Sequence, residues 1–260
     1  MTEEQKSLGW LSSILDILRR DCPWDRVQTI DSLRYLTIEE VYELSESIVT
    51  GDRKGMCSEL GDLFLHLLFY SKIADDEGAF STSDVIDGIC RKLISRHPHI
   101  PLPDRDGILQ PAKSKEQPHW EEVKMKEHRK SVLEGVPSSL PPLVKAIRMQ
   151  EKAAGMGFEF PDKESAYAKV DEEYHEFLDA LENGDKEHAE EELGDLLFAI
   201  VKWGRFEGLN ADDALSRANL KFQKRLTYVE QKAHDTNRQL KDLSIDEMVS
   251  LWNKAKKEKL

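Results

Sequence analysis

Cysteine, long apolar runs and a leader-like start are scarce or missing in this 260-residue sequence. Its three cysteines, Cys22, Cys57 and Cys90, are far apart and odd in number, which is typical of reduced thiols and argues against a disulfide framework or a zinc site. The most apolar run, residues 63–70, is short and interrupted by a histidine, and the first residues lack the basic and apolar segments of a signal peptide. We therefore expect a cytoplasmic protein without a membrane partner.

Basic residues are scarce relative to acidic ones. The sequence has 37 lysines and arginines against 50 aspartates and glutamates, which gives a formal net charge of −13. Such a surface repels nucleic acids and anionic membranes, so neither is expected as a partner. The chain also lacks a Gly-x-x-x-x-Gly-Lys-Ser/Thr phosphate loop. An acidic protein that handles phosphate groups needs cations between itself and its substrate.

The most informative feature that is present is an internal repeat. Two acidic motifs occur twice with the same offset of 133 residues, and a Gly-Asp pair lies between them in each copy. The first motif is Glu39-Glu40-x-x-Glu43 and Glu172-Glu173-x-x-Glu176; the second is Glu59-Leu60-Gly61-Asp62 and Glu192-Leu193-Gly194-Asp195. An ungapped match that preserves both motifs and the turn between them predicts a duplicated helical hairpin.

Apolar residues recur at helical spacing throughout, whereas alternating strand patterns are scarce, so we predict an all-α fold without strands. Its two tandem modules are each centred on an acidic helical hairpin. Prolines predict a loop over residues 98–113 and a linker near residues 135–142, which places the domains at 1–134 and 135–260. Helices are expected over residues 7–20, 31–49, 53–76, 83–96, 115–131, 141–154, 163–182, 186–207, 211–234 and 245–257.

The acidic residues of each hairpin are expected to converge. Glu173 and Glu176 are three residues apart and share a helix face, as do Glu192 and Asp195 on the next helix. Glu176 precedes the Gly184 turn by about as many residues as Glu192 follows it, so the four carboxylates lie at similar height. One such cluster alone would be typical of a solvated helix surface, but its duplication favours a site. Converged carboxylates repel one another, and their oxygen ligands favour Mg²⁺ or Mn²⁺.

These ordered motifs resemble a known family. Together with Cys22-Pro23-Trp24-Asp25 and Arg96-His97-Pro98-His99 in the first half, they are similar to the MazG family of all-α nucleotide pyrophosphatases over nearly the whole chain. The resemblance implies hydrolysis of nucleoside triphosphates between the α and β phosphates, giving a monophosphate and pyrophosphate, with broad use of ribo- and deoxynucleotides. It also implies a homodimer.

The resemblance further implies a role for each matching residue. Glu172, or its counterpart Glu39, would orient or deprotonate the attacking water. Metal ligands would be Glu173, Glu176, Glu192 and Asp195, with a second possible site at Glu40, Glu43, Glu59 and Asp62. Lys221 and Arg225 would bind the phosphates of the substrate. The Trp252 indole would stack on the base, with Lys256 one helical turn further on. The Asn219 amide would contact the base or the sugar.

Two other functions remain open at this point. Glu172 and His175 form one Glu-x-x-His motif, as in di-iron carboxylate bundles, but that class uses two such motifs and the first half has Tyr42 at the matching position. A non-enzymatic acidic regulator that binds a basic protein is the other alternative. In a regulator the helix acids would be solvated and interchangeable, so Asp195→Asn would change little.

Overall fold

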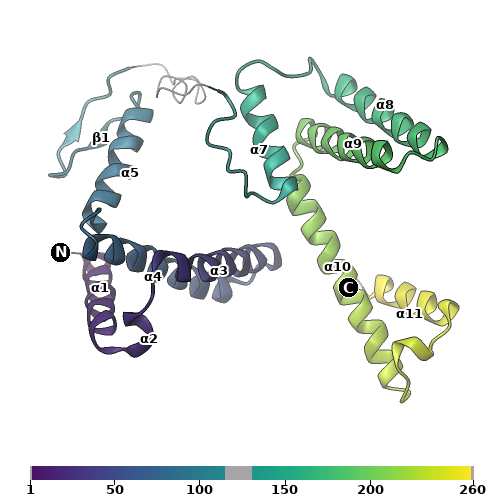
Figure 1. Ribbon diagram of the computed structural model, residues 1–260, viewed down its shortest axis with the longest axis horizontal. Helices are drawn as coiled ribbons and strands as arrows, with labels where there is room; N and C mark the ends of the chain where they lie inside the picture. The colour runs from purple at the N-terminus through teal and green to yellow at the C-terminus, as the bar shows by residue number, and fades with distance from the viewer. Residues whose placement is uncertain (1, 115–130, 259–260) are drawn as a thin grey trace. The chain divides into compact units, whose positions relative to one another are not determined.

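The computed structural model describes residues 2–114 and 131–258 (Figure 1). The chain forms two compact units, Met1–Pro118 and His119–Leu260. The first contains α1 (Glu3–Asp21), α2 (Pro23–Arg26), α3 (Ile30–Thr50), α4 (Arg53–Asp76), α5 (Thr82–Arg96), β1 (Leu102–Pro103) and β2 (Leu109–Gln110). The second contains α7 (Pro142–Ala154), α8 (Lys163–Glu182), α9 (Lys186–Phe206), α10 (Ala211–His234), the 3-10 helix η1 (Leu240–Asp242) and α11 (Ile245–Lys257).

The predicted all-α architecture is confirmed, and most predicted helices end within a few residues of the observed ones. The expectation of no strands is wrong in one place. Within the predicted loop 98–113, β1 and β2 form a two-stranded antiparallel hairpin. The Asp104 side chain closes its turn by accepting hydrogen bonds from the N–H groups of Asp106 and Ile108, at 3.0 and 2.9 Å. The helix expected over residues 115–131 falls almost wholly outside the described residues.

Each unit contains one long antiparallel helical hairpin, α3–α4 in the first and α8–α9 in the second. The predicted turns are confirmed, because Gly51 and Gly184 have φ angles of 75° and 72°, a left-handed conformation that favours glycine. The following aspartates, Asp52 and Asp185, cap the next helix by accepting hydrogen bonds from its first N–H groups. The same Gly-Asp pair therefore ends one helix and starts the next in both units.

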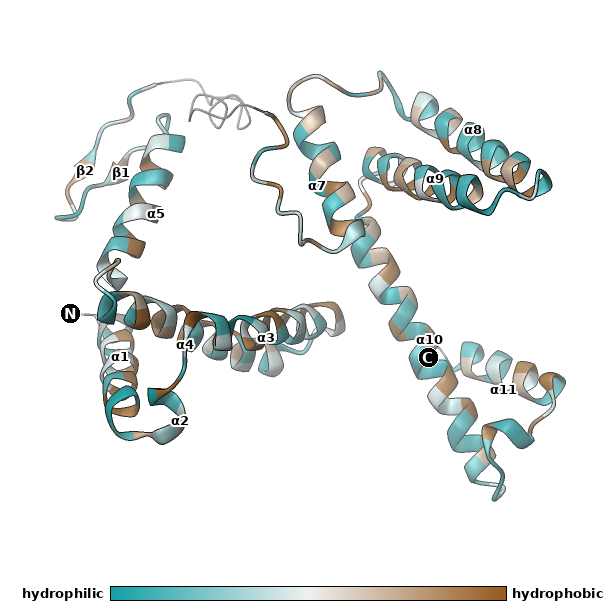
Figure 2. Ribbon diagram, viewed as in Figure 1, coloured by the Kyte–Doolittle hydropathy of each residue, from teal (hydrophilic) through white to brown (hydrophobic). Residues whose placement is uncertain are grey.

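Each unit contains an apolar cluster that holds several of its helices together. In the first unit, Leu15, Leu33, Phe69 and Ile73 join α1 and α3 to α4. In the second, a cluster centred on Val229 joins α10 to η1 and α11. Figure 2 shows apolar and polar residues interspersed along α8 and α9, as expected for amphipathic helices. Among the described residues, no helix combines the length and apolar character that a membrane crossing requires.

Residues 131–134 are attached to the second unit. The Lys152 ammonium of α7 donates hydrogen bonds to the backbone oxygens of Val132 and Glu134, at 3.1 and 3.0 Å. The Lys152 side chain is buried, so these bonds compensate for the lost hydration of its charge. These residues therefore pack with α7, and the predicted domain boundary after residue 134 stays a prediction.

Candidate metal and active site

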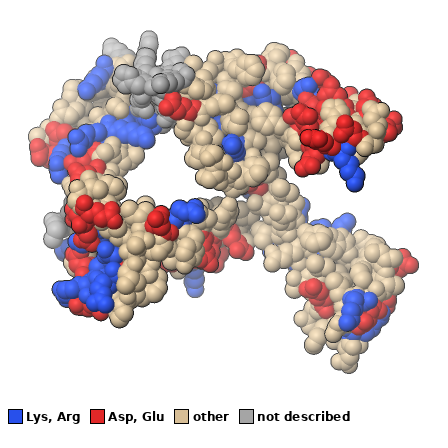
Figure 3. All heavy atoms as spheres, in the orientation of Figure 1, with Lys and Arg blue, Asp and Glu red and all other residues tan. Residues whose placement is uncertain are grey.

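The α8–α9 hairpin brings three of the predicted ligands together. One carboxylate oxygen from each of Glu173, Glu192 and Asp195 lies within 4.8 Å of the others. Glu173 comes from α8 and is only 7% exposed, whereas Asp195 at the surface of α9 is exposed. Figure 3 shows acidic side chains gathered over this hairpin. We call Glu173, Glu192 and Asp195 the C-terminal acidic cluster.

The fourth predicted ligand, Glu176, lies outside that triplet, but the charges of Glu173 and Glu192 affect its pKa. Partial burial raises the pKa of Glu176, and the neighbouring Glu173 and Glu192 raise it further. Like charges favour the protonated form of a carboxyl group, so charge repulsion destabilises the cluster when no cation balances it. Its role as a ligand stays a prediction.

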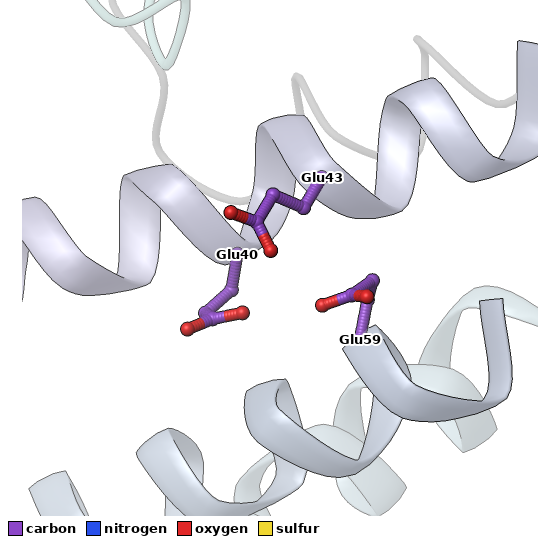
Figure 4. A group of neighbouring side chains, drawn as sticks. All are labelled: Glu40, Glu43 and Glu59. Atoms are coloured by element: carbon purple, nitrogen blue, oxygen red, sulfur yellow. The ribbon is translucent and has the colours of Figure 1, made fainter. Parts of the chain in front are cut away.

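The α3–α4 hairpin of the first unit also carries an acidic cluster, the N-terminal acidic cluster. Figure 4 shows Glu40, Glu43 and Glu59 directed toward one another, and one oxygen from each lies within 4.8 Å of the others. Burial raises the pKa values of Glu40 and Glu43, and Asp62, the predicted fourth ligand, is one of the acids that raise them further. With the offset of 133, the two clusters share the pairs Glu40/Glu173 and Glu59/Glu192, and they differ in the third member, which is Glu43 in one and Asp195 in the other.

A basic residue that the sequence reasoning missed lies at the C-terminal acidic cluster. The Lys169 ammonium is 2.7 Å from carboxylate oxygens of both Glu172 and Glu173, and these contacts raise its pKa. The i, i+3 and i, i+4 spacing could have revealed this pairing. In the first repeat the corresponding residue is Leu36. The two clusters therefore differ in the charge that surrounds them.

The predicted substrate-binding residues form a separate group on α10 and α11. The Arg225 guanidinium lies over the Trp252 ring, 5.8 Å from its centroid, and the Phe222 ring is 5.3 Å from it. Trp252 also packs against the apolar cluster at Val229. Lys221, Asn219 and Lys256 are exposed.

Within one chain, this group does not join the acidic cluster. Figure 1 shows α10 leading away from the α8–α9 hairpin, with α11 folded onto the far part of α10. In the first unit, Arg96, the counterpart of Arg225, is only 7% exposed. Trp120 and Lys124, which match Trp252 and Lys256, lie outside the described residues.

The ligand types argue against the di-iron alternative. His175 lies outside both acidic clusters, and its Nδ1 is 2.7 Å from the backbone oxygen of Asp171. In the part of the chain that the structure describes, both groups able to hold a metal consist of carboxylates alone. Carboxylate oxygens suit hard cations such as Mg²⁺ and Mn²⁺ rather than zinc or copper.

The fold and these clusters define an all-α protein with two helical hairpins, each presenting carboxylates suited to a divalent cation. The chain belongs to the MazG nucleotide pyrophosphohydrolase family, whose domain model matches residues 28–101 and 162–229. Both matched segments contain an acidic hairpin. The family shows that the chain is a hydrolase of phosphoric anhydrides rather than a non-enzymatic regulator.

Individual relatives agree with this assignment. The chain is 39% identical to the nucleoside triphosphate pyrophosphohydrolase/pyrophosphatase MazG of Thermotoga maritima, over 95% of this chain and 94% of that protein. It is 33% identical to the nucleoside triphosphate pyrophosphohydrolase of Escherichia coli, over 97% of this chain and 99% of that protein. It is also 39% identical to the uncharacterized protein YabN of Bacillus subtilis, over 90% of this chain but 48% of that protein.

Removing the Glu176 carboxylate should stabilise the metal-free protein at neutral pH. Because the folded-state pKa of Glu176 is raised, the folded state binds its proton more tightly than the unfolded state. Its contribution to stability is therefore present at low pH and declines as the pH rises through the usual glutamate range toward the folded-state pKa. We expect Glu176→Gln to raise the melting temperature in a chelator at about pH 7 more than at about pH 4.

Glu182→Gln is the control for that comparison, because Glu182 is exposed on the same helix and belongs to neither acidic cluster. Thermal melts of the three proteins across this pH range provide the measurement. If Glu176→Gln and Glu182→Gln change the melting temperature equally at every pH, then charge repulsion at the cluster does not destabilise the metal-free protein.

Proposed function

We propose that the protein hydrolyses nucleoside triphosphates to a nucleoside monophosphate and pyrophosphate, with Mg²⁺ held by Glu173, Glu176, Glu192 and Asp195. Mn²⁺ would serve as a substitute. The observation that carries the proposal is the C-terminal acidic cluster, in which three oxygen donors from two helices lie within 4.8 Å of one another inside a matched family segment. When bound, the cation would neutralise the triphosphate and favour deprotonation of the attacking water.

The remaining side chains act on water and phosphate. Glu172 would orient the water or take its proton, and its contact with Lys169 holds its carboxylate beside the cluster. Lys221 and Arg225 do not join the acidic cluster within one chain, so in the homodimer proposed below they would bind the outer phosphate oxygens of a substrate held at the cluster of the second copy. The planar guanidinium offers paired donors for such a contact. Holding the outer phosphates leaves the α phosphorus open to water. No residue of the chain needs to become covalently attached to the substrate.

A homodimer is part of this proposal. Large apolar side chains are exposed on both hairpins, among them Val41, Phe64 and Leu67 on α3–α4 and Leu181 and Leu197 on α8–α9. Exposed apolar surface on this scale is typical of association between proteins. A second copy would cover it, and sedimentation velocity would measure the resulting mass. We place the protein in the cytoplasm, whose reducing conditions suit its three free cysteines.

Broad substrate use is expected, with ribo- and deoxynucleotides of all common bases hydrolysed. The proposed contacts reach phosphates, and phosphates are shared by every nucleotide. The test is a panel of nucleoside triphosphates with Mg²⁺, in which products are separated to distinguish pyrophosphate from orthophosphate. Turnover of a single base alone would contradict the broad specificity, and turnover of none would contradict the proposed function.

A further inference from the structure

A cavity of about 340 Å³ lies between α7 and α9 of the second unit. Its walls include Met149 and Ala153 of α7, Phe198 and Lys202 of α9, and Phe158 of the intervening chain. We call this cavity the α7–α9 pocket. Its volume falls at the lower end of the range for small-molecule sites, roughly 300–1,000 Å³. None of the residues that line it is a predicted metal ligand or substrate-binding residue.

The first unit fills the matching place with one of its own side chains. There α1 packs against α4 as α7 packs against α9. An offset of 134 aligns Arg19 of α1 with Ala153 of α7, and the offset of 133 aligns Phe69 of α4 with Lys202 of α9. The Arg19 guanidinium lies over the Phe69 ring, 5.5 Å from its centroid, and the Arg19 side chain is only 16% exposed. Because Ala153 has no such side chain, the α7–α9 pocket is open in the second unit.

A buried acceptor lies in the wall of this pocket. Gln150 of α7 lines the pocket and is only 2% exposed. Its amide nitrogen donates to the backbone oxygen of Phe198, at 2.8 Å, but its Oε1 atom has no hydrogen-bond partner among the described residues. An unpaired acceptor in a buried position costs free energy, and buried polar groups are almost always hydrogen-bonded. The wall therefore favours a ligand that brings an N–H or O–H donor to Gln150.

Positive charge is in excess beside the pocket. The Lys202 ammonium is 3.4 Å from a carboxylate oxygen of Glu159, and the same carboxylate is paired with Arg205. Glu151, whose charge also acts on Arg205, is itself paired with Arg148. Three cations therefore share two carboxylates. A ligand carboxylate at Lys202 would balance the remaining positive charge through a charge-assisted hydrogen bond.

Aromatic rings supply the rest of the contact surface. The Phe158 side chain is 78% exposed, which leaves its ring accessible, and the Phe198 side chain forms part of the wall on α9. The Lys202 ammonium lies 6.0 Å from the Phe158 ring centroid and 5.0 Å from that of Phe160. Aromatic rings pack against one another in offset or edge-to-face arrangements, so a planar ring suits this surface.

We infer that the α7–α9 pocket is a second ligand site, separate from the metal and substrate site, that binds a small aromatic carboxylate with an N–H donor. The donor binds Gln150 Oε1, the ring packs against Phe158 and Phe198, and the carboxylate pairs with Lys202. The proposed metal ligands face one another between α8 and α9, whereas this pocket lies between α7 and α9. The inference goes beyond the proposed function and does not depend on it.

The experiment uses three matched probes on the full-length protein without metal or nucleotide. Indoleacetate has both the N–H donor and the carboxylate, skatole lacks the carboxylate, and naphthaleneacetate lacks the N–H donor. The ¹³C-labelled methyl group of Met149 reports binding by NMR, because Met149 lines the pocket. We expect a saturable shift with indoleacetate and at least about threefold weaker binding of each analogue, as expected for the loss of one hydrogen bond. Adenosine should not displace indoleacetate.

Variants of one pocket residue test the location. Ala153→Leu fills the pocket and should abolish the shift, whereas Ala154→Leu makes the same change one residue outside the pocket and should preserve it. A shift that survives Ala153→Leu would place the probe elsewhere and overturn the inference. Circular dichroism confirms that both variants are folded.

A change at Lys202 tests the charge, and it decides the matter if Ala153→Leu fails to fold. Lys202→Met keeps a long apolar side chain but removes the ammonium, so indoleacetate should then bind no better than skatole. Unchanged discrimination in Lys202→Met would overturn the inference.

Three further results would also overturn it. The first is the absence of a saturable shift with every probe. The second is displacement of indoleacetate by adenosine, which would show that the pocket belongs to the substrate site. The third is a Met149 signal that responds to protein concentration and not to the probes, because a second copy would then cover the pocket.

Discussion

Asp195→Asn or Glu192→Gln is expected to lower turnover by at least about 100-fold. Each change removes a charged oxygen donor from the C-terminal acidic cluster while preserving side-chain size. Replacing a residue that merely orients a metal ligand typically lowers metal affinity or activity 10–100-fold. Replacing a ligand itself should lower activity by at least as much. Steady-state rates with ATP and Mg²⁺ measure the effect, after circular dichroism and sedimentation confirm that each variant is folded and associated like the original.

The matched changes in the first unit should leave most of the turnover. Glu59→Gln and Asp62→Asn alter the equivalent positions of the repeat, so they serve as internal controls. The second repeat has more acid near its ligands, which favours cation capture: Asp171, Glu190 and Glu191 replace Ile38, Cys57 and Ser58. Arg96 of the first unit is also buried, whereas Arg225 is half-buried. Equal losses from both pairs would show two equivalent sites, and a larger loss from Glu59 or Asp62 would reverse the assignment.

Chelation of divalent cations is expected to abolish turnover, and Mg²⁺ should restore it. At an effective dielectric constant of 20, two carboxylates about 4 Å apart repel by roughly 4 kcal/mol, so a converged cluster requires a cation or protons. Since a cation at 100 times its Kd stabilises the folded state by about 2.7 kcal/mol, Mg²⁺ should also raise the melting temperature. Asp195→Asn should reduce that rise. Full hydrolysis after exhaustive chelation would contradict the proposed chemistry.

The hairpins and their clusters could be predicted from the sequence because their causes are local. Helical spacing determines which acids share a face, and Gly184 followed by Asp185 marks where one helix ends and the next begins. The repeat then adds an independent copy of the same pattern. Glu173, Glu192 and Asp195 could thus be placed together before their distances were known.

Other features depend on contacts that no local pattern reports. The burial of Arg96 and the α7–α9 pocket arise from packing between elements that are distant in sequence. The separation of Arg225 and Trp252 from the acidic cluster depends on the direction of α10, which helical spacing does not determine. The β1–β2 hairpin is too short for a period of two to be visible.

Phosphorus-31 NMR of ATP incubated with the purified protein and Mg²⁺ tests the central claim most directly. The original protein should produce AMP and pyrophosphate as first products, in equal amounts from the start of the reaction. Asp195→Asn, as the matched control, should form both far more slowly. If ADP and orthophosphate appear first, the protein cleaves the outer phosphate instead, and the proposed arrangement of phosphates, cation and water is wrong.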